Sequence, residues 1–248
     1  LEEKRNKGIF LTVLGFGTEN IKDNRLEQMA DNGNGHYAYI DNLLEAKKVL
    51  VDEIGSTLFT IAKDVKIQVE FNPAKVKEYR LVGYENRLLN AEDFENDLKD
   101  AGEIGSGHSV TALYEIVPQE FEGDISDSEL RYQVVYIKES DQVLNEFGNI
   151  KVRYKMPDED ESKLITKVVT KDIVDLEKTS DNFKFAASVA MFGMLLRDSE
   201  FKGDTESNLI LKLAKNSLGD DKTGYRSEFV KLVELSENLD QYAGTIGN

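Results

Sequence analysis

The sequence predicts an α+β protein in three parts: the tail of a parallel, Rossmann-like α/β domain over residues 1–58, an antiparallel β-sandwich over residues 59–178, and a small helical bundle over residues 179–248. Three observations predict this division. Apolar strands and helices alternate at the start of the chain, short strands with period-two patterns fill the middle, and helical periodicity returns towards the end.

The first part begins with a continuous apolar run, GIFLTVLGFG, which is typical of a parallel strand buried on both faces. NRLEQMADNGNG then predicts a short helix that stops at Asn32 and Gly33, and HYAYID predicts a second strand. NLLEAKKVLVDEIGSTLF carries apolar residues at helical spacing after a cap at Asp41 or Asn42. Two strands are too few for a parallel sheet, so we expect the tail of a larger domain.

The middle part contains short strands separated by turns. DVKIQVEFNP alternates apolar and polar residues, as half-buried antiparallel strands do, and Pro73 ends it. The acidic stretch from Ala91 to Glu103 carries Phe94 and Leu98 at helical spacing and predicts a short surface helix. The other predicted strands are KEYRLVGYE, HSVTALYEIVP, ELRYQVVYIKE, NIKVRYKMP and KLITKVVT.

The last part is helical. Ser180 or Asp181 can cap a helix that runs from Phe183 to Leu196, and ESNLILKLAKNSLG predicts a second helix that ends at Gly219. YRSEFVKLVELSENLD predicts a third, and we expect the three helices to pack as a bundle.

Composition excludes several classes of function. The chain has 31 basic and 47 acidic residues among 248, a net charge of −16, and such a field repels nucleic acids and anionic lipid surfaces. It has no cysteine, which excludes disulfides and thiolate metal sites. The longest apolar run, from Phe185 to Leu196, is shorter than the roughly 20 residues that a membrane span needs, so we expect no direct membrane insertion.

The two histidines, His36 and His108, are the first candidates for chemistry. His108 lies in GSGHS, which differs from the G-x-S-x-G of a nucleophile elbow and precedes a strand instead of a helix. We therefore interpret residues 105–109 as a turn that leads into a strand. His36 has no second histidine or carboxylate beside it at metal-ligand spacing. We predict no catalytic, cofactor-binding or metal-binding residues in this chain; a hydrolase that uses His108 is a less favoured alternative.

Other motifs are weaker. GFGTEN begins like a dinucleotide-binding fingerprint, but Asn20 replaces its third glycine. The acidic runs DNGNGH, PDEDES and GDDKTG miss the register of a calcium-binding EF-hand loop and are interpreted as solvated turns. A carbohydrate- or calcium-binding sandwich stays as the main alternative function.

Residues 8–41, GIFLTVLGFGTENIKDNRLEQMADNGNGHYAYID, resemble the late strand–helix–strand portion of a von Willebrand factor type A domain. The rest of the chain resembles the C-terminal region of the bacterial YfbK-like group of such proteins. The stretches that carry this second resemblance are DVKIQVEFNPAKVKEYRLVGYENR, GSGHSVTALYEIVP, FKFAASVAMFGMLLRDS and GYRSEFVKLVELS.

The resemblance implies a non-enzymatic protein-interaction or adhesion module in the bacterial cell envelope, with a protein partner. Type A domains generally bind Mg²⁺ or a similar ion through a D-x-S-x-S motif that precedes the strand found here after Gly8. No such motif stands at a matching place, so the resemblance implies a metal site upstream of this chain and no metal ligand within it. It also implies that the strand from Ile9 to Phe16 is an exposed sheet edge, open to self-association.

Overall fold

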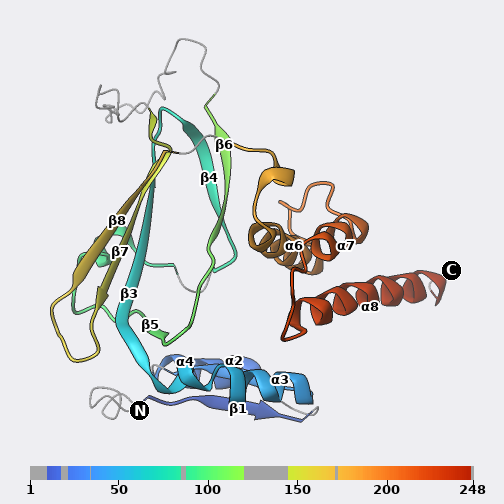
Figure 1. Ribbon diagram of the computed structural model, residues 1–248, viewed down its shortest axis with the longest axis horizontal. Coiled ribbons are helices and arrows are strands. Elements are labelled where there is room, and N and C mark those ends of the chain that lie inside the picture. The colour runs from blue at the N-terminus through green and yellow to red at the C-terminus, as the bar shows by residue number, and fades with distance from the viewer. Residues whose placement is uncertain are drawn as a thin grey trace. The chain divides into compact units, whose positions relative to one another are not determined.

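The computed structural model describes residues 10–17, 22–33, 35–84, 88–119, 145–170 and 173–246, with backbone alone for residues 238–246 (Figure 1). The fold is mixed α/β with antiparallel strand pairing. The chain forms two compact units. One holds residues 1–76, 87–110 and 119–170; the other holds residues 77–86, 111–118 and 171–248. The three-part division of the sequence stays a prediction.

The first unit begins with the predicted strand–helix–strand segment. β1 (Val13–Phe16) and β2 (Tyr37–Ile40) pair in parallel, and α2 (Asp23–Asp31) connects them and packs against both. The helix ends where the sequence predicts, since the Gly33 amide donates to the Ala30 carbonyl at 2.9 Å. The strand is shorter than the apolar run, and Ile9 lies outside the described residues.

The next predicted helix is divided into three. Its segments are α3 (Leu43–Lys47), the π-helical η1 (Lys48–Asp52) and α4 (Ile54–Leu58). Asn42 is its cap: the side-chain oxygen accepts from the amides of Leu44 at 2.8 Å and Glu45 at 3.0 Å. The division has a local cause, because the Gly-Ser-Thr sequence of α4 has low helix propensity and the Ser56 hydroxyl bonds the Glu53 carbonyl.

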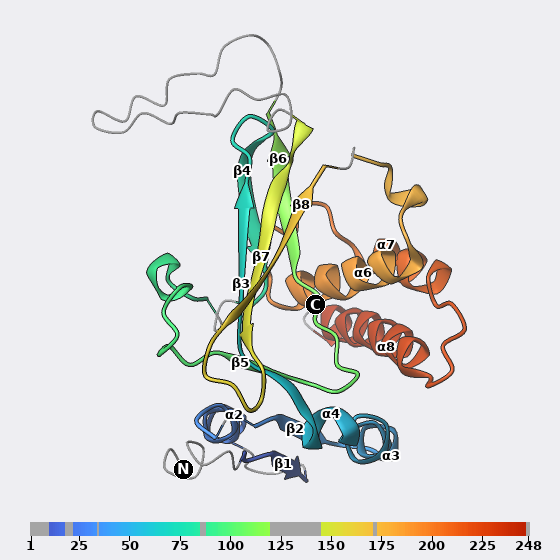
Figure 2. The same ribbon diagram turned by 60° about the vertical axis from the view of Figure 1, so that its left-hand side comes forward.

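An antiparallel sheet of four strands follows in the same unit, in the order β5-β3-β7-β8, so that β7 lies between β3 and β8 (Figure 2). Its register aligns Ile67, Val152 and Ile165 across three strands. Asp64, at φ 52°, lies at an irregularity in β3 where the pairing register shifts. The strands are β3 (Thr60–Phe71), β5 (Gly102–Gly105), β7 (Gly148–Lys155) and β8 (Lys163–Val169).

The predicted surface helix over residues 91–103 is wrong. Only a 3-10 turn forms there, η3 (Ala91–Asp93), and β5 begins inside the predicted helix. An asparagine side chain takes up a backbone amide that a helix would use: the Asn96 side-chain oxygen accepts from the Leu98 amide at 3.0 Å.

A separate two-stranded sheet pairs β4 (Val76–Val82) with β6 (Leu113–Pro118). An ion pair joins Arg80 of β4 to Glu115 of β6. The predicted strand over residues 129–139 lies outside the described residues, and the sandwich itself stays a prediction.

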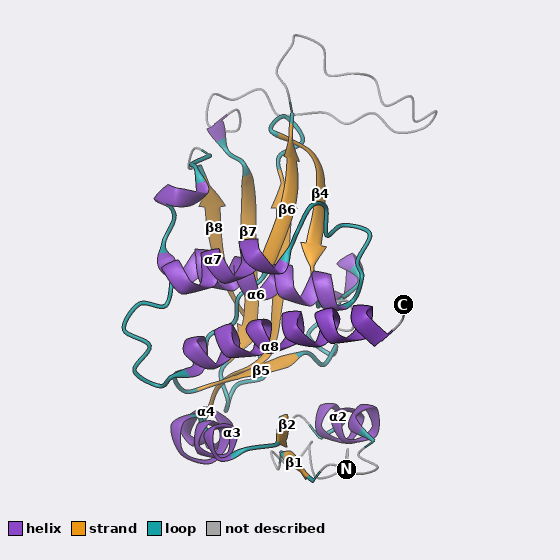
Figure 3. Ribbon diagram, turned by 90° about the vertical axis from the view of Figure 1, so that its right-hand side faces the viewer, coloured by secondary structure: helices purple, strands orange, loops and turns teal. Residues whose placement is uncertain are grey.

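The second unit contains the predicted helical bundle, drawn in purple in Figure 3. Ser180 caps the first helix by accepting from the Phe183 amide at 3.2 Å. The helices pack on one another around a core in which Ile210 and Val233 are fully buried. The elements are η4 (Leu176–Lys178), α6 (Asp181–Leu196), α7 (Ser207–Asn216) and α8 (Tyr225–Ile246).

Candidate functional site

The glycine-rich stretch before His108 forms a turn, as predicted. Gly107 has φ +78°, and the His108 amide donates to the Gly105 carbonyl at 3.1 Å. Gly105 has a packing reason of its own: a Cβ there would lie 1.6 Å from the Ser56 carbonyl oxygen. The turn does not lead straight into a strand, because β6 begins only at Leu113. The absence of a side chain at Gly105 therefore allows the end of β5 to pack closely against α4.

The structure brings the two histidines together. The ring centroids of His36 and His108 are 6.3 Å apart, with the ring planes tilted by 36°. Both residues are exposed, and His36 stands immediately before β2, where its carbonyl accepts from the Val13 amide at 2.8 Å. Sequence spacing gave no sign of this pair, because 71 residues separate the two positions (108 − 36 − 1). Thus the side chain beside His108 is a second imidazole.

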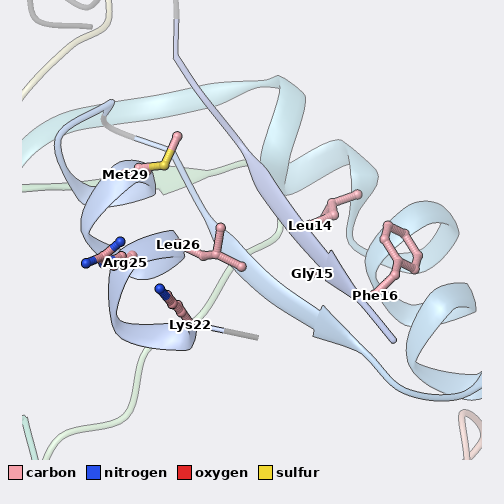
Figure 4. A pocket seen from close by; sticks show the side chains of 7 residues that line it. All are labelled: Leu14, Gly15, Phe16, Lys22, Arg25, Leu26 and Met29. Atoms are coloured by element: carbon pink, nitrogen blue, oxygen red, sulfur yellow. The ribbon is translucent and has the colours of Figure 1, made fainter. Parts of the chain in front are cut away.

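A second candidate is an open groove between β1 and α2 (Figure 4). Leu26 points from α2 towards β1, and its Cδ1 lies 3.6 Å from where a Gly15 Cβ would be. Leu14 and Phe16 point to the other side of the strand in Figure 4. The groove is lined by Leu14, Gly15, Phe16, Lys22, Arg25, Leu26 and Met29, and is therefore apolar with two cations.

The edge of β1 at this groove is open. Within the described ranges, β1 pairs with β2 and with no other strand. Phe16 is 62% exposed although it belongs to a strand whose sequence predicts burial on both faces. On the same unit, Leu43 of α3 is 85% exposed, and Val51, Leu58 and Phe59 are exposed as well. So much exposed apolar surface on one segment is typical of a region that is covered by another chain or domain.

Beside the groove, β2 is tied to α2 by a hydrogen bond. The Tyr37 hydroxyl donates to the Asp23 carboxylate, and this bond raises the pKa of Tyr37 to about 12. The Tyr39 hydroxyl in turn donates to the Gly17 carbonyl. The first bond ties β2 to α2, and the second ties β2 to the residue that follows β1. The elements that line the groove are therefore linked to one another by hydrogen bonds.

Sequence reasoning missed a charge cluster on the four-stranded sheet. Lys155 donates to the Asp64 carboxylate at 2.8 Å and to the Asp97 carbonyl at 2.7 Å, and Arg153 Nε donates to the Asp97 carboxylate at 3.0 Å. The Ser162 hydroxyl donates to the same carboxylate, and this bond, with Arg153, holds the pKa of Asp97 below its usual range. Each of these charges has a partner, so the cluster serves to attach residues 91–101 to the sheet.

One member of this cluster is almost completely buried. Lys66 is 3% exposed, and its ammonium donates to the Asn96 carbonyl. Burial lowers the pKa of Lys66 because it disfavours the charged form. The only local signal in the sequence is a lysine in the middle of a strand, which looks the same as a solvated one.

Two of the three acidic runs contribute hydrogen bonds or ion pairs to the fold. In GDDKTG, the Asp221 carboxylate accepts from the amides of Arg226 at 3.0 Å and Ser227 at 2.8 Å and thus caps the first turn of α8. Burial alone would raise the pKa of Asp221, but the hydrogen bonds from Ser227 and Arg226 outweigh it, so the pKa lies below the usual range. In PDEDES, Glu159 pairs with Lys163 at 2.8 Å. Among the described residues, no three histidine or acidic side chains gather to hold a metal ion.

Comparison with known proteins identifies the family. Residues 56–239 match the family described as "Uncharacterized protein YfbK, C-terminal". The chain belongs to the YfbK family. Over 239 residues it is 39% identical to "Uncharacterized protein YfbK" of Escherichia coli (strain K12), and the match covers 96% of this chain but 41% of that relative. No solved structure matches the chain.

Two further observations concern membrane crossing and the D-x-S-x-S pattern. In the described part of the chain, no helix combines the length and the apolar character that crossing a membrane requires. The letters DISDS at residues 124–128 fit the D-x-S-x-S pattern, but they follow β6 instead of a buried parallel strand and lie outside the described residues.

Proposed function

We propose that this chain is the C-terminal region of a non-enzymatic interaction protein of the von Willebrand factor type A class, active in the bacterial cell envelope. In this proposal the β1–β2 segment is the last part of the type A sheet, and the Mg²⁺-dependent ligand site lies in the portion upstream of it. The chain itself supplies a scaffold and a second contact surface for a protein partner.

The observation that carries the proposal is the open edge of β1. A parallel strand pair with helices packed on it is stable as part of a larger sheet, because parallel sheets bury both faces. Here the pair stands without a second neighbour for β1 in the described residues, and Phe16 lies exposed beside the groove. The E. coli relative is more than twice as long as the part matched, which supports a further portion of sheet for this edge.

A substitution at Phe16 tests whether a further portion of the protein covers β1. In the chain alone, Phe16→Lys should change the free energy of unfolding by less than about 0.5 kcal/mol, as substitutions at exposed sites do. In a chimera that joins the unmatched portion of E. coli YfbK to this chain, the same change buries a charge beside the completed sheet. We expect it to destabilise the chimera by about 2 kcal/mol or more.

Leu98→Lys is the matched control, because Leu98 is 95% exposed and lies far from β1 in the sequence. It should be neutral in both backgrounds. If the chimera folds poorly, the same two substitutions can be made at the aligned positions of E. coli YfbK. The comparison is then between the full-length and the truncated E. coli protein. Equal tolerance of the Phe16 change in short and long proteins would refute the proposal. A calorimetric Mg²⁺ signal from this chain alone would refute the upstream metal site.

A further inference from the structure

We propose that His36 and His108 together form a binding site for a divalent late transition-metal ion, with Ni²⁺, Cu²⁺ and Zn²⁺ as the class. This site is separate from the Mg²⁺ site discussed above, because it uses nitrogen ligands and lies in residues that the structure describes. It does not depend on the type A assignment.

The spacing of the rings suits one shared ion. Metal–nitrogen bonds to imidazole are about 2.0–2.1 Å long, which places the two ring centroids roughly 5–6 Å apart when one ion lies between them. The centroids of His36 and His108 are 6.3 Å apart. Both residues are exposed, and the proposal requires each ring to turn so that one nitrogen of each reaches the shared ion.

The backbones that carry the two rings are fixed. His36 is held at the start of β2, because its carbonyl accepts from the Val13 amide at 2.8 Å. His108 follows a turn that is held on α4 and β3: the Ser106 amide donates to the Phe59 carbonyl at 2.8 Å, and Gly105 leaves no room for a Cβ beside Ser56. Ligands placed on ordered elements lose little freedom when they bind an ion.

The chemistry favours nitrogen-seeking ions. Imidazole binds Ni²⁺, Cu²⁺ and Zn²⁺ well, whereas Ca²⁺ and Mg²⁺ prefer oxygen ligands. The negative charge of the chain, −16, raises the local concentration of any cation. Two protein ligands leave the other coordination positions to water, so the site should bind more weakly than a closed four-ligand site and should exchange its ion freely.

The test is a calorimetric titration of the complete chain, freed of any affinity tag, with NiCl₂ and with ZnCl₂ at neutral pH. We expect one ion per chain, and an affinity at least tenfold lower in His36→Gln, in His108→Gln and in the double variant alike. Ser109→Ala, beside His108, should bind as the parent does. MgCl₂ and CaCl₂ should give no such histidine-dependent signal.

A second readout separates a shared ion from two independent ones. A shared ion links the start of β2 to the turn after β5 and so raises the melting temperature of the parent chain, because it binds the folded form alone. That rise should vanish in each single variant, while the melting temperatures without metal stay close to that of the parent. Single variants that keep half of the bound ion, or a double variant that binds as tightly as the parent, would overturn the proposal.

Discussion

The helical bundle buries more of its large apolar residues than the β1–β2 segment does, although Leu196 and Leu235 of the bundle are exposed as well. In the bundle, Ile210 and Val233 are fully buried among neighbours from the three helices. In the N-terminal segment, Ile40 is buried, but Phe16 and Leu43 are largely exposed. A bundle closes its core with its own helices, whereas a parallel strand pair needs further strands to do so. Under the proposal above, the exposed segment is where a partner or a further part of the sheet would bind.

The largest expected effect lies in the bundle. Ile210→Ala should lower the free energy of unfolding by about 2–5 kcal/mol, because it leaves a cavity in a closed core. Leu209→Ala, one residue away on the same helix and 47% exposed, should cost less than about 1 kcal/mol. Chemical denaturation of both variants measures the difference. Equal costs would show that the bundle core is no better packed than the N-terminal surface.

The next effect concerns the attachment of the N-terminal segment to the four-stranded sheet. Gly105→Ala should destabilise the first unit by about 1–3 kcal/mol, since the new methyl group must displace the Ser56 backbone. Gly102→Ala is the control in the same strand, because a Cβ there meets nothing within 4 Å. If the two variants melt alike, α4 and β5 are not in the contact described here.

The smallest effect is a pH dependence within the sheet. The pKa of Asp97 is lowered in the folded protein, so its contribution to stability is present above the usual aspartate pKa and is lost as pH falls through the lower, folded value. Melting temperatures of the parent and Asp97→Asn should therefore differ at pH 7 and converge in acid. Glu95→Gln, in the same exposed stretch, should follow the parent throughout. A gap between the parent and Asp97→Asn that stays as wide in acid as at pH 7 would contradict the assignment.

Local signals predicted most of the helical structure. The caps at Ser180 and Asn42 and the apolar spacing of α6, α7 and α8 are all contained in short windows of sequence, and the structure confirms them. The predicted helix over residues 91–103 failed because Phe94 and Leu98 fit a helical period by chance. Phe94 is buried, Leu98 is exposed, and the intervening backbone bonds its own asparagine side chain.

Long-range features could not be predicted in this way. The histidine pair depends on a turn being pressed against α4, and the buried Lys66 depends on a loop that returns from 30 residues further along the chain. Contacts between residues so far apart in the chain produce no periodic pattern in the sequence. The interpretation of residues 105–109 as a turn succeeded because glycine chemistry is local. The meeting of His108 with His36 is a property of the fold.

Hydrogen–deuterium exchange of the chain and of the chimera with the unmatched portion of E. coli YfbK tests the central claim most directly. The amides of β1 (Val13–Phe16) should exchange quickly in the chain and slowly in the chimera, while those of α7 (Ser207–Asn216) stay slow in both. Protection of β1 in the chain alone, equal to that of α7, would contradict the account, because it would show that the N-terminal segment is complete without a further strand.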